Sequence, residues 1–391
     1  MQNSYQMSCI TSNSRLVFFT YHDFESHHVT GGTRRLLELI RSFSDKGAHV
    51  TIFCPKSKVI EEIPNVNHIP LKYKKNGFLP AGLVNFIINY FFVKKQLKQL
   101  DYDWSVAVDV PYAIQLKYLG FRKICFIVWQ DFIGYRSFEG DSLKNGFINN
   151  LRLKTLTRIE KIVLQSVSKI NIQCQYDLDV LKGRHPMLSS QIIKKAFLIP
   201  NNVNTSWLQK ETQTESSMTK DAHCSGFTIM FIGNVSDTRK GLHILLEAYA
   251  GTELLNTCKL HIIGGGDLLP YYKKKYSKFK NITFEGSNPS PLSFLKAANL
   301  LVVPSLADSF PNTILEALYL NIPVIGSNKG GIPEALKYEE LIFELNAEAL
   351  QKKIVSLLDK KNYLEIAEIC KKRKEELTFD WGKDMLNGII C

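Results

Sequence analysis

Closely spaced cysteines are missing from this sequence, although it contains eight cysteines. They are scattered, with no C-x-x-C pair and no histidine cluster beside them: Cys9, Cys54, Cys125, Cys174, Cys224, Cys258, Cys370 and Cys391. Disulfide frameworks and structural zinc sites both need cysteines at short, regular spacing. We therefore expect reduced, buried thiols, as in a cytosolic protein, and no metal site.

A long uninterrupted hydrophobic run is also missing. The most apolar stretch, residues 78–93, is interrupted by four residues: Pro80, Gly82, Asn85 and Asn89. It is therefore too short and too polar to span a bilayer comfortably. The first four residues are polar and uncharged, and no apolar core of about 7–15 residues follows them, so we expect no secretory signal. The sequence favours a cytoplasmic protein, attached at most to a membrane surface.

Repeats and low-complexity tracts are absent, and the 391 residues are 45% hydrophobic and 22% charged. These values exclude wholesale disorder and predict two or three globular domains. The net charge is +12, and residues 1–200 carry all of it, with 27 basic and 15 acidic side chains. This asymmetry predicts two domains with different partners, the first of which meets something anionic.

The first half reads as a parallel α/β sheet. An apolar run at 15–21 leads into a polar loop with Gly31 and Gly32, and an amphipathic helical pattern then ends at Gly47 before a strand at 49–54. Strand, glycine turn, helix and strand are the beginning of such a sheet. Further buried strands are predicted at 105–108, 123–129, 170–173 and 196–200.

The second half has a cleaner alternation, which predicts a second doubly wound sheet. Strands are expected at 228–232, 260–263, 282–284, 300–303 and 323–325, with helices at 241–250, 270–280, 291–298 and 312–320. We predict a first domain over 1–204, a linker over 205–226, a second domain over 227–375 and a tail over 376–391. The tail is expected to pack back on the first domain, or alternatively to form a final helix of the second. Two such domains place a ligand cleft at the carboxyl ends of both sheets.

Two glycine turns follow strands of the second half. Residues 233–241 open a helix and carry Arg239 and Lys240, which favours a bound diphosphate, since helix N-termini and cations attract anions. The alternative is an exposed, solvated turn. Gly265 lies in a second turn at 264–266, whose glycines permit close backbone approach of a ligand or simply make a tight turn. Neither turn has the dinucleotide-binding spacing, which disfavours a nicotinamide dehydrogenase.

The segment 303–318 carries the densest signals. A strand ends here, Asp308 follows in a loop, and Pro311 lies near the first turn of a helix, where Asn312 and Thr313 have free amides. Glu316 follows eight residues after Asp308, so both carboxylates can line one pocket and accept hydrogen bonds from sugar hydroxyls. Alternatively, Asp308 interacts only with the helix dipole and Glu316 lies on a solvated face.

With these motifs the sequence closely resembles retaining, nucleotide-sugar-dependent glycosyltransferases of family 4, which have two facing Rossmann-like domains, the GT-B fold. The resemblance covers nearly the whole chain and is most specific between 227 and 335. It rests on Asp308-x7-Glu316 with Ser309-Phe310-Pro311-Asn312 between, and on Pro304-Ser305, Pro323-Val324, Gly330-Gly331-Ile332-Pro333-Glu334, Gly31-Gly32, the crossover at 199–204 and Phe379-Asp380-Trp381.

The resemblance implies a role for each matching residue. Lys240 would bind the pyrophosphate of a UDP- or GDP-sugar, Glu316 the ribose hydroxyls, and Asp308 the transferred sugar. The other implied donor-binding residues are Gly31, Gly32, Arg239, Gly265, Ser309, Phe310, Pro311, Asn312 and Thr313. The implied enzyme is a retaining, metal-independent hexosyltransferase with no cofactor, and its acceptor is a growing, lipid-linked glycan of a surface polysaccharide.

Three positions depart from the family pattern. Asp308 replaces the first Glu, and Asn234 replaces an Arg, so that either Arg239 takes over its role or the phosphate is held more weakly. Gln130 occupies the position of a His that many members carry after the fourth strand, which makes Asp131 the alternative polar group on the acceptor side. His22, His27 and His28, near the glycine loop, either contribute or are ordinary exposed loop histidines. Asn234 and Gln130 leave one function of another class open, a catalytically silent nucleotide- or glycan-binding partner of a glycosyltransferase complex.

The positive charge of the first half surrounds its apolar stretch. Lys72, Lys74 and Lys75 precede residues 78–93, and Lys94, Lys95 and Lys98 follow them. Large apolar residues flanked by lysines are typical of a helix at the interface with anionic lipid. A buried helix with a solvated lysine end is the alternative. We interpret the charge as a peripheral membrane face, and we expect no nucleic-acid partner.

Overall fold

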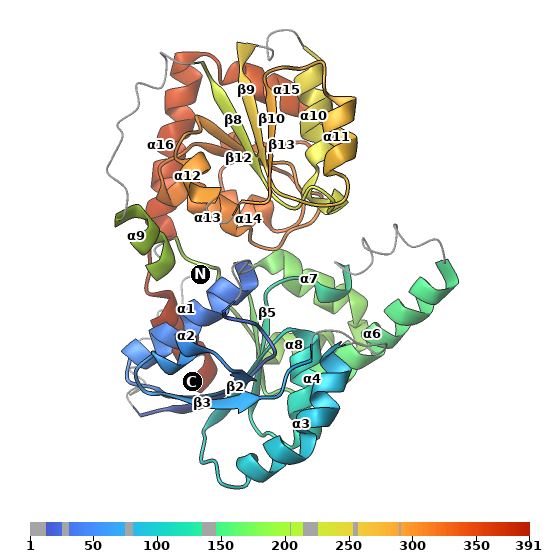
Figure 1. The fold of residues 1–391 in the computed structure, drawn as a ribbon, viewed down its shortest axis with the longest axis vertical. Coiled ribbons are helices and arrows are strands. Elements are labelled where there is room, and N and C mark those ends of the chain that lie inside the picture. Colours follow the sequence, from blue (N-terminus) through green and yellow to red (C-terminus); the bar gives the residue numbers. More distant parts are fainter. Residues whose placement is uncertain are drawn as a thin grey trace.

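The protein folds into two α/β domains, one at each end of the elongated molecule in Figure 1. The computed structural model describes residues 13–25, 31–74, 81–134, 146–203, 205–213, 226–252, 257–288 and 291–391. Six predicted residues of interest, Cys9, His27, His28, Lys75, Asn204 and Cys224, therefore lie outside the described residues.

The N-terminal domain contains a sheet of seven strands, all parallel, in the order β3-β2-β1-β4-β5-β6-β7. The strands are β1 (Arg15–Phe19), β2 (His49–Pro55), β3 (Val66–Leu71), β4 (Trp104–Val108), β5 (Ile124–Val128), β6 (Lys169–Ile172) and β7 (Ala196–Leu198). The helices are α1 (Gly31–Asp45), α2 (Lys58–Glu61), α3 (Ala81–Leu97), α4 (Asp109–Leu119), α6 (Gly146–Ser166), α7 (Gln175–Arg184) and α8 (Ser189–Lys195).

The C-terminal domain contains six parallel strands in the order β10-β9-β8-β11-β12-β13. The strands are β8 (Thr228–Ile232), β9 (Lys259–Ile263), β10 (Ile282–Gly286), β11 (Leu300–Val303), β12 (Val324–Ser327) and β13 (Ile342–Phe343). The helices are α10 (Leu242–Ala250), α11 (Leu269–Lys275), α12 (Pro291–Leu295), α13 (Asn312–Tyr319), α14 (Ile332–Leu336), α15 (Ala347–Ser356) and α16 (Lys360–Glu376).

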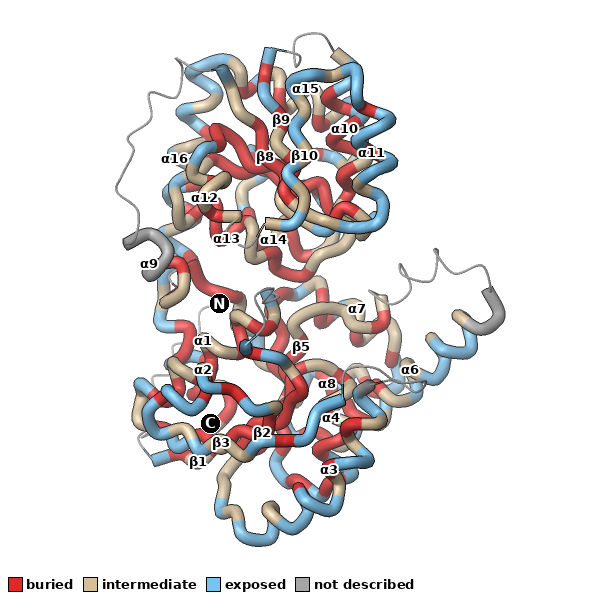
Figure 2. Tube along the Cα trace, viewed as in Figure 1, coloured by how far each residue is buried: buried red, intermediate tan, exposed pale blue. Residues whose placement is uncertain are grey.

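Both sheets are buried on their two faces, as Figure 2 shows by the red strands inside each domain. In β1, Leu16 and Phe18 contribute to one apolar cluster, whereas Val17 and Phe19 contribute to the cluster on the opposite face. Alternate side chains of a strand point to opposite faces, so a strand covered on both sides must be apolar throughout. This is why short continuous apolar runs predicted most of the strands correctly, and the predicted fold class is confirmed.

Two strands were not predicted. The sheet edge strand β3 contains Asn67, His68 and Pro70, and an edge strand tolerates such residues because it pairs on one side only. The strand β13 has only two residues, too few to form a pattern. Within the predicted linker, residues 206–213 form helix α9 (Ser206–Gln213).

The chain crosses between the domains twice, and the two crossings lie side by side. The Val203 amide donates to the Leu377 carbonyl at 3.0 Å, and the Asn202 amide side chain donates to the Phe379 carbonyl at 3.4 Å. After the second crossing, α17 (Trp381–Ile390) packs on α1 of the N-terminal domain (Figure 1). Trp381 and Met385 belong to the apolar core of that domain.

Five of the cysteines have free thiols and are buried, as expected: Cys54, Cys125, Cys174, Cys258 and Cys370. Cys391 is disulfide-bonded, which the scattered spacing did not predict. Among the helices of the described ranges, none has the length and hydrophobicity that crossing a membrane requires.

Candidate functional site

A cavity of ≈ 550 Å³ lies between the two domains, where the carboxyl ends of both sheets face each other. In each sheet the strand order reverses here, between β1 and β4 and between β8 and β11. Ligands of doubly wound sheets bind at this switch point, because the loops on either side of it diverge and leave a crevice. The lining comes from both domains: His22, Gly31, Gly32, Arg34, Arg35, Asp109, Trp129, Gln130, Gln173, Asn201, Ile232, Gly233, Lys240, Pro291, Asp308, Ser309, Phe310, Pro311, Asn312, Thr313 and Glu316.

Lys240 lies at the end of a 3-10 turn that follows β8, and its ammonium forms an ion pair with Asp308. Nζ of Lys240 is 2.9 Å from both carboxylate oxygens. The turn approaches the end of β11 closely because Gly241, with a φ of 68°, has no side chain: a Cβ there would lie 1.8 Å from the Pro304 carbonyl oxygen. This glycine therefore allows the cation and the carboxylate to meet in the cavity.

Arg239, the neighbour of Lys240, does not line this cavity. Its guanidinium is 2.7 Å from Asp237 and 3.2 Å from the Ala307 carbonyl, and the side chain is buried. It borders a smaller adjoining cavity of ≈ 50 Å³. Gly265 likewise lies outside the lining of the large cavity, in a turn where a Cβ would lie 2.1 Å from the Ser287 hydroxyl.

The first turn of α13 forms one wall of the cavity. Pro311 precedes the helix and provides no side-chain cap for its amides, and Asn312 and Thr313 line the cavity. Glu316, one turn further along, is 93% buried and also faces the cavity. Helix amides without intrahelical partners, combined with buried carboxylates, suit a ligand that carries both phosphates and hydroxyls.

A second glycine pair supports the loop that carries Asp308. Gly331 donates its amide to the Asp308 carbonyl at 2.7 Å, and a Cβ on Gly331 would lie 1.9 Å from the Ser309 carbonyl oxygen. Gly330 has a φ of 62°, which places it in the left-handed region that favours glycine. The Gly330-Gly331 motif therefore positions the loop without itself lining the cavity.

Arg35, on α1, joins the two domains beside the cavity and was not predicted from the sequence. Its guanidinium donates to the Asn312 side chain at 3.0 Å and to the side chain and carbonyl of Asn202 at 2.9 Å each. Burial lowers the pKa of Arg35 to about 10. Gly31, at the start of the same helix, lies close to Asn312. A Cβ on Gly31 would lie 2.8 Å from the side-chain amide nitrogen of Asn312.

The start of α7 forms a second bridge between the domains. The Ser309 hydroxyl donates to Asp177 at 2.8 Å, and the Glu334 carboxylate accepts from the amides of Gln175 and Tyr176 at 2.7 Å each. A carboxylate is stabilised at a helix N-terminus by the helix dipole. Here the carboxylate comes from the C-terminal domain and the helix from the N-terminal domain, so this contact holds the two domains together.

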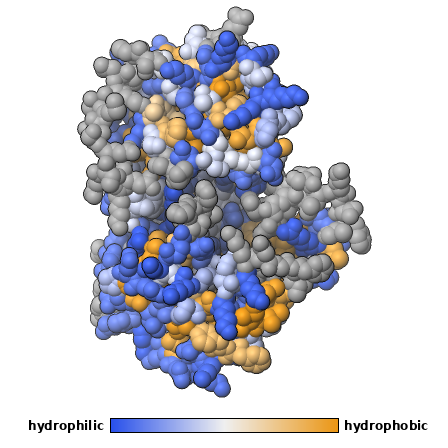
Figure 3. Space-filling model, in the orientation of Figure 1, coloured by the Kyte–Doolittle hydropathy of each residue, from blue (hydrophilic) through white to orange (hydrophobic). Residues whose placement is uncertain are grey.

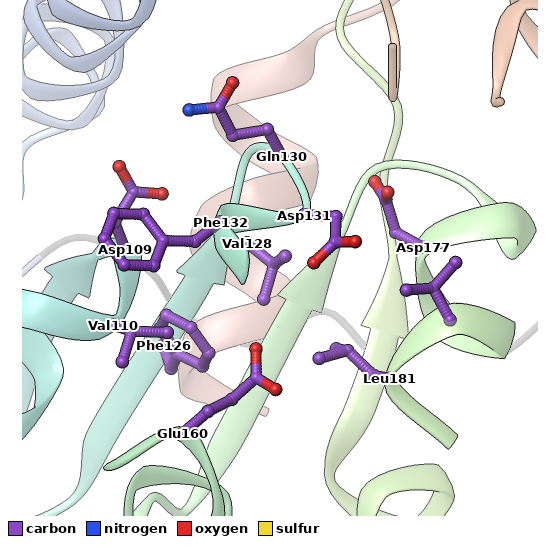
Figure 4. Close-up of a pocket in the computed structure, with 11 residues that line it drawn as sticks. Asp109, Val110, Phe126, Val128, Gln130, Asp131, Phe132, Glu160, Asp177 and Leu181 are labelled. Atoms are coloured by element: carbon purple, nitrogen blue, oxygen red, sulfur yellow. The ribbon is translucent and has the colours of Figure 1, made fainter. Parts of the chain in front are cut away.

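Gln130 and Asp131 are the predicted acceptor-side residues, and they follow β5. On the sequence alone this strand is the fourth, because β3 is not predicted. Gln130 lines the large cavity, whereas Asp131 is ion-paired with Arg184, which also contacts Glu160 at 3.0 Å. Figure 4 shows Asp131, Glu160 and Asp177 around a small neighbouring cavity, with Gln130 pointing away from them. Asp131 is thus held in a partly buried charge network and borders the adjoining cavity of ≈ 50 Å³ beside Asp308 and Ser309.

Two further lining residues of the N-terminal domain have unusual environments. Asp109 follows β4 with a φ of 64°, a left-handed conformation that is uncommon for residues other than glycine. Burial lowers the pKa of His22 to about 4, so the imidazole is neutral at physiological pH. Asp109 escaped prediction because a single Asp after a strand has no distinctive spacing. In the described ranges, no three His, Cys, Asp or Glu side chains are grouped so as to hold a metal ion.

Residues 226–360 match the family of glycosyl transferases group 1. A glycosyltransferase of Methanocaldococcus jannaschii is 26% identical over 221 residues, which cover 55% of this chain and 51% of the relative. The phosphatidyl-myo-inositol mannosyltransferase of Mycobacterium leprae is 26% identical over 170 residues, 42% of this chain and 44% of the relative. The chain thus spans about half the length of the curated relatives it matches.

Solved structures extend the likeness to both domains. Sucrose-phosphate synthase from Thermosynechococcus elongatus superposes with a TM-score of 0.72 at 18% identity, covering 95% of this chain and 97% of that one. Anabaena HepE in complex with UDP-glucose superposes with a TM-score of 0.66 at 14% identity, covering 96% and 98%. The GT-B fold of the glycosyltransferases is thereby confirmed.

Proposed function

We propose that this chain, with its group 1 domain and GT-B fold, is a retaining glycosyltransferase of family 4. It transfers a hexose from a UDP- or GDP-sugar to a growing, lipid-linked glycan in surface polysaccharide synthesis, on the cytoplasmic side of a membrane. The observation that carries the proposal is the composition of the cleft, in which Lys240, Asp308 and Glu316 of one domain face the Gly31-Gly32 pair of the other.

The donor would bind mainly to the C-terminal domain. Lys240 and the first turn of α13 would hold the pyrophosphate, since an ammonium and free helix amides both favour phosphate oxygens. Glu316 would accept hydrogen bonds from the ribose hydroxyls, and Asp308 from the sugar. Asp308 is the shorter of the two acids, and its contact with Lys240 supports a position beside the pyrophosphate.

Transfer breaks the bond between the anomeric carbon and the diphosphate, and a new bond forms from that carbon to the acceptor oxygen with retained configuration. The proton of the acceptor hydroxyl passes to the leaving diphosphate. Negative charge develops on the leaving diphosphate, so fixed positive charge there lowers the barrier more than a strong base would. We assign this charge to Lys240 and the α13 N-terminus, with no metal and no cofactor. Addition of EDTA is then expected to leave the rate unchanged.

The acceptor would enter from the N-terminal domain, near Gln130 and Asp109. The mycobacterial relative is named for a phospholipid, phosphatidyl-myo-inositol. This name supports a lipid-linked acceptor for the present chain. HepE, in its complex with UDP-glucose, supports a UDP-sugar as the first donor to test.

The test measures release of UDP or GDP from a panel of UDP- and GDP-sugars, with and without isolated lipid-linked glycans. Lys240→Ala and Glu316→Ala are expected to abolish transfer while the protein stays folded. Lys352→Ala and Glu348→Ala are matched controls, because these residues form an exposed ion pair on α15. Near-normal transfer by both site variants would refute the site assignment.

A catalytically silent binding partner is the second candidate, and Gln130 favours it. An amide at this position has no pKa near neutrality, and the neighbouring Asp131 is engaged by Arg184. A silent partner binds nucleotide in a thermal-shift assay but releases none from any donor sugar, whereas the enzyme does both. Transfer by the wild type eliminates this candidate.

A further inference from the structure

Helix α3 of the N-terminal domain presents its two asparagines to the protein interior. Asn85, Asn89 and Val93, spaced four residues apart, are fully or almost fully buried. The Asn85 side chain exchanges two hydrogen bonds with the backbone of Lys74, at 2.8 and 3.0 Å, and Asn89 does the same with Lys72, at 3.0 and 2.9 Å. These four bonds anchor the helix to the segment after β3 and fix its rotation.

This anchoring turns large apolar side chains outward. Phe91 is 83% exposed and Ile87 58% exposed, although both are among the side chains most often buried in folded proteins. Their exposed neighbours on the same helix are Leu83, Ile88 and Phe92. Figure 3 shows the corresponding hydrophobic surface at the end of the N-terminal domain that lies away from the cleft. A contiguous apolar surface of this kind on a soluble domain marks an interaction site.

The segment that carries this face has basic residues and no acidic ones. No acidic residue occurs between residues 63 and 100, whereas six lysines do. Five of them lie in the described ranges, and all five are exposed: Lys72, Lys74, Lys94, Lys95 and Lys98. The Lys94 ammonium lies 4.9 Å from the centre of the Tyr90 ring, so it extends along the helix beside the aromatic residues.

We propose that the outward face of α3, Leu83 to Phe92 with the flanking lysines, docks on the surface of an anionic lipid bilayer. Phe91 and Ile87 enter the headgroup layer, and the lysines contact lipid phosphates. Apolar side chains with cations and no acidic groups match a bilayer surface, since acyl chains and phosphates lie within one helix diameter of each other. A protein partner would need its own acidic, apolar surface in the same arrangement. The sequence leaves two alternatives for this segment, a buried helix and a helix at a lipid interface. In the structure, α3 has one buried face and one exposed apolar face.

The test is co-sedimentation with phosphatidylcholine vesicles, prepared with and without phosphatidylglycerol. We expect about tenfold tighter binding to the anionic vesicles, weakened by added salt. Ile87→Ser combined with Phe91→Ser is expected to reduce binding about tenfold. Lys94→Glu combined with Lys95→Glu is expected to remove the preference for anionic lipid. Met187→Ser is the matched control, because Met187 is 90% exposed on the same domain, outside α3.

Two results would overturn the proposal. One is equal sedimentation with and without either vesicle. The other is a dimer in sedimentation velocity that the Ile87 and Phe91 variant dissociates, because the face would then bind a second copy of the chain. The inference does not depend on glycosyl transfer. Binding of UDP or GDP by the α3 variants is expected to match the wild type, which separates a failure of docking from a failure of the proposed activity.

Discussion

The ammonium of Lys240 is equidistant, at 2.9 Å, from the two carboxylate oxygens of Asp308, 68 residues away in the sequence. Both groups are candidates for donor binding, and in the absence of donor they neutralise each other. A bound pyrophosphate would therefore replace Asp308 as the partner of Lys240 and free Asp308 to accept hydrogen bonds from the sugar.

This exchange separates the effects of changing the two residues. Lys240→Met is expected to weaken UDP or GDP binding about 10- to 100-fold, the loss of one charged hydrogen bond to phosphate. Asp308→Asn is expected to leave binding of the free nucleotide unchanged or tighter, and to abolish use of the sugar donor. Titration calorimetry with nucleotide and with nucleotide-sugar measures both. Equal weakening of nucleotide binding by the two variants would contradict the exchange.

Arg35 is expected to be a major contributor to stability. Arg35→Ala removes its hydrogen bonds to Asn202 and Asn312 in a buried location, so the free energy of unfolding should fall by about 3 kcal/mol. Arg34→Ala is the control, because Arg34 is only partly buried and stacks at 5.2 Å over the Trp207 ring, an interaction of about 1 kcal/mol. Urea denaturation of both variants measures the difference, and similar losses in the two would contradict the role of Arg35.

Two glycine substitutions should have opposite effects. Gly331→Ala places a Cβ against the Ser309 carbonyl and the Cys174 thiol, so the loop carrying Asp308 must move, and both stability and donor binding should fall. Gly183→Ala, in the last turn of α7, meets no atom within 4 Å and should stabilise the protein by about 0.5–1 kcal/mol. Melting temperatures with and without nucleotide report both effects. An unchanged nucleotide-induced shift in Gly331→Ala would show that this turn does not position the site.

Stability should depend on pH through Asp177. Burial raises the pKa of this carboxyl to about 6, against the hydrogen bond from Ser309 that lowers it. Since the folded protein holds the proton more tightly than the unfolded chain, the free energy of unfolding should fall as the pH rises from about 4 to about 6, by at most about 3 kcal/mol. Asp177→Asn should remove this component from urea denaturation curves recorded across that range. Asp179→Asn, an exposed change on the same helix, should retain it.

Most of the fold was predictable because its signals are local. The central strands of both sheets are covered on two faces, so runs such as 16–19 and 229–232 are apolar throughout and stand out from the helices between them. The strands that escaped prediction, β3 and β13, lack this pattern because one is a polar edge strand and the other has two residues. Of the predicted donor residues, Lys240, Asp308 and Glu316 line one cavity, because each follows a strand end or a helix start at the same sheet edges.

Contacts between distant parts of the chain were not predictable. Arg35 and Asn312 are 277 residues apart, and their hydrogen bond depends on how two separately folded domains close. Similarly, Arg239 looked equivalent to its neighbour Lys240, but its guanidinium is bound by the carbonyl of Ala307, 68 residues away, as well as by the nearby Asp237, and lies outside the large cavity.

The sequence by itself determined that there are two doubly wound domains, that the first is basic and the second neutral, and which chemical groups follow the strands. These features could be predicted because hydrophobic periodicity and composition are local properties of the chain. Only the tertiary structure decided which cation enters the cleft, how α7 and α1 hold the domains together, and which face of α3 meets the solvent. Those outcomes depend on the hydrogen bonds of Asn85, Asn89, Arg35 and Asp177, whose partners come from other segments.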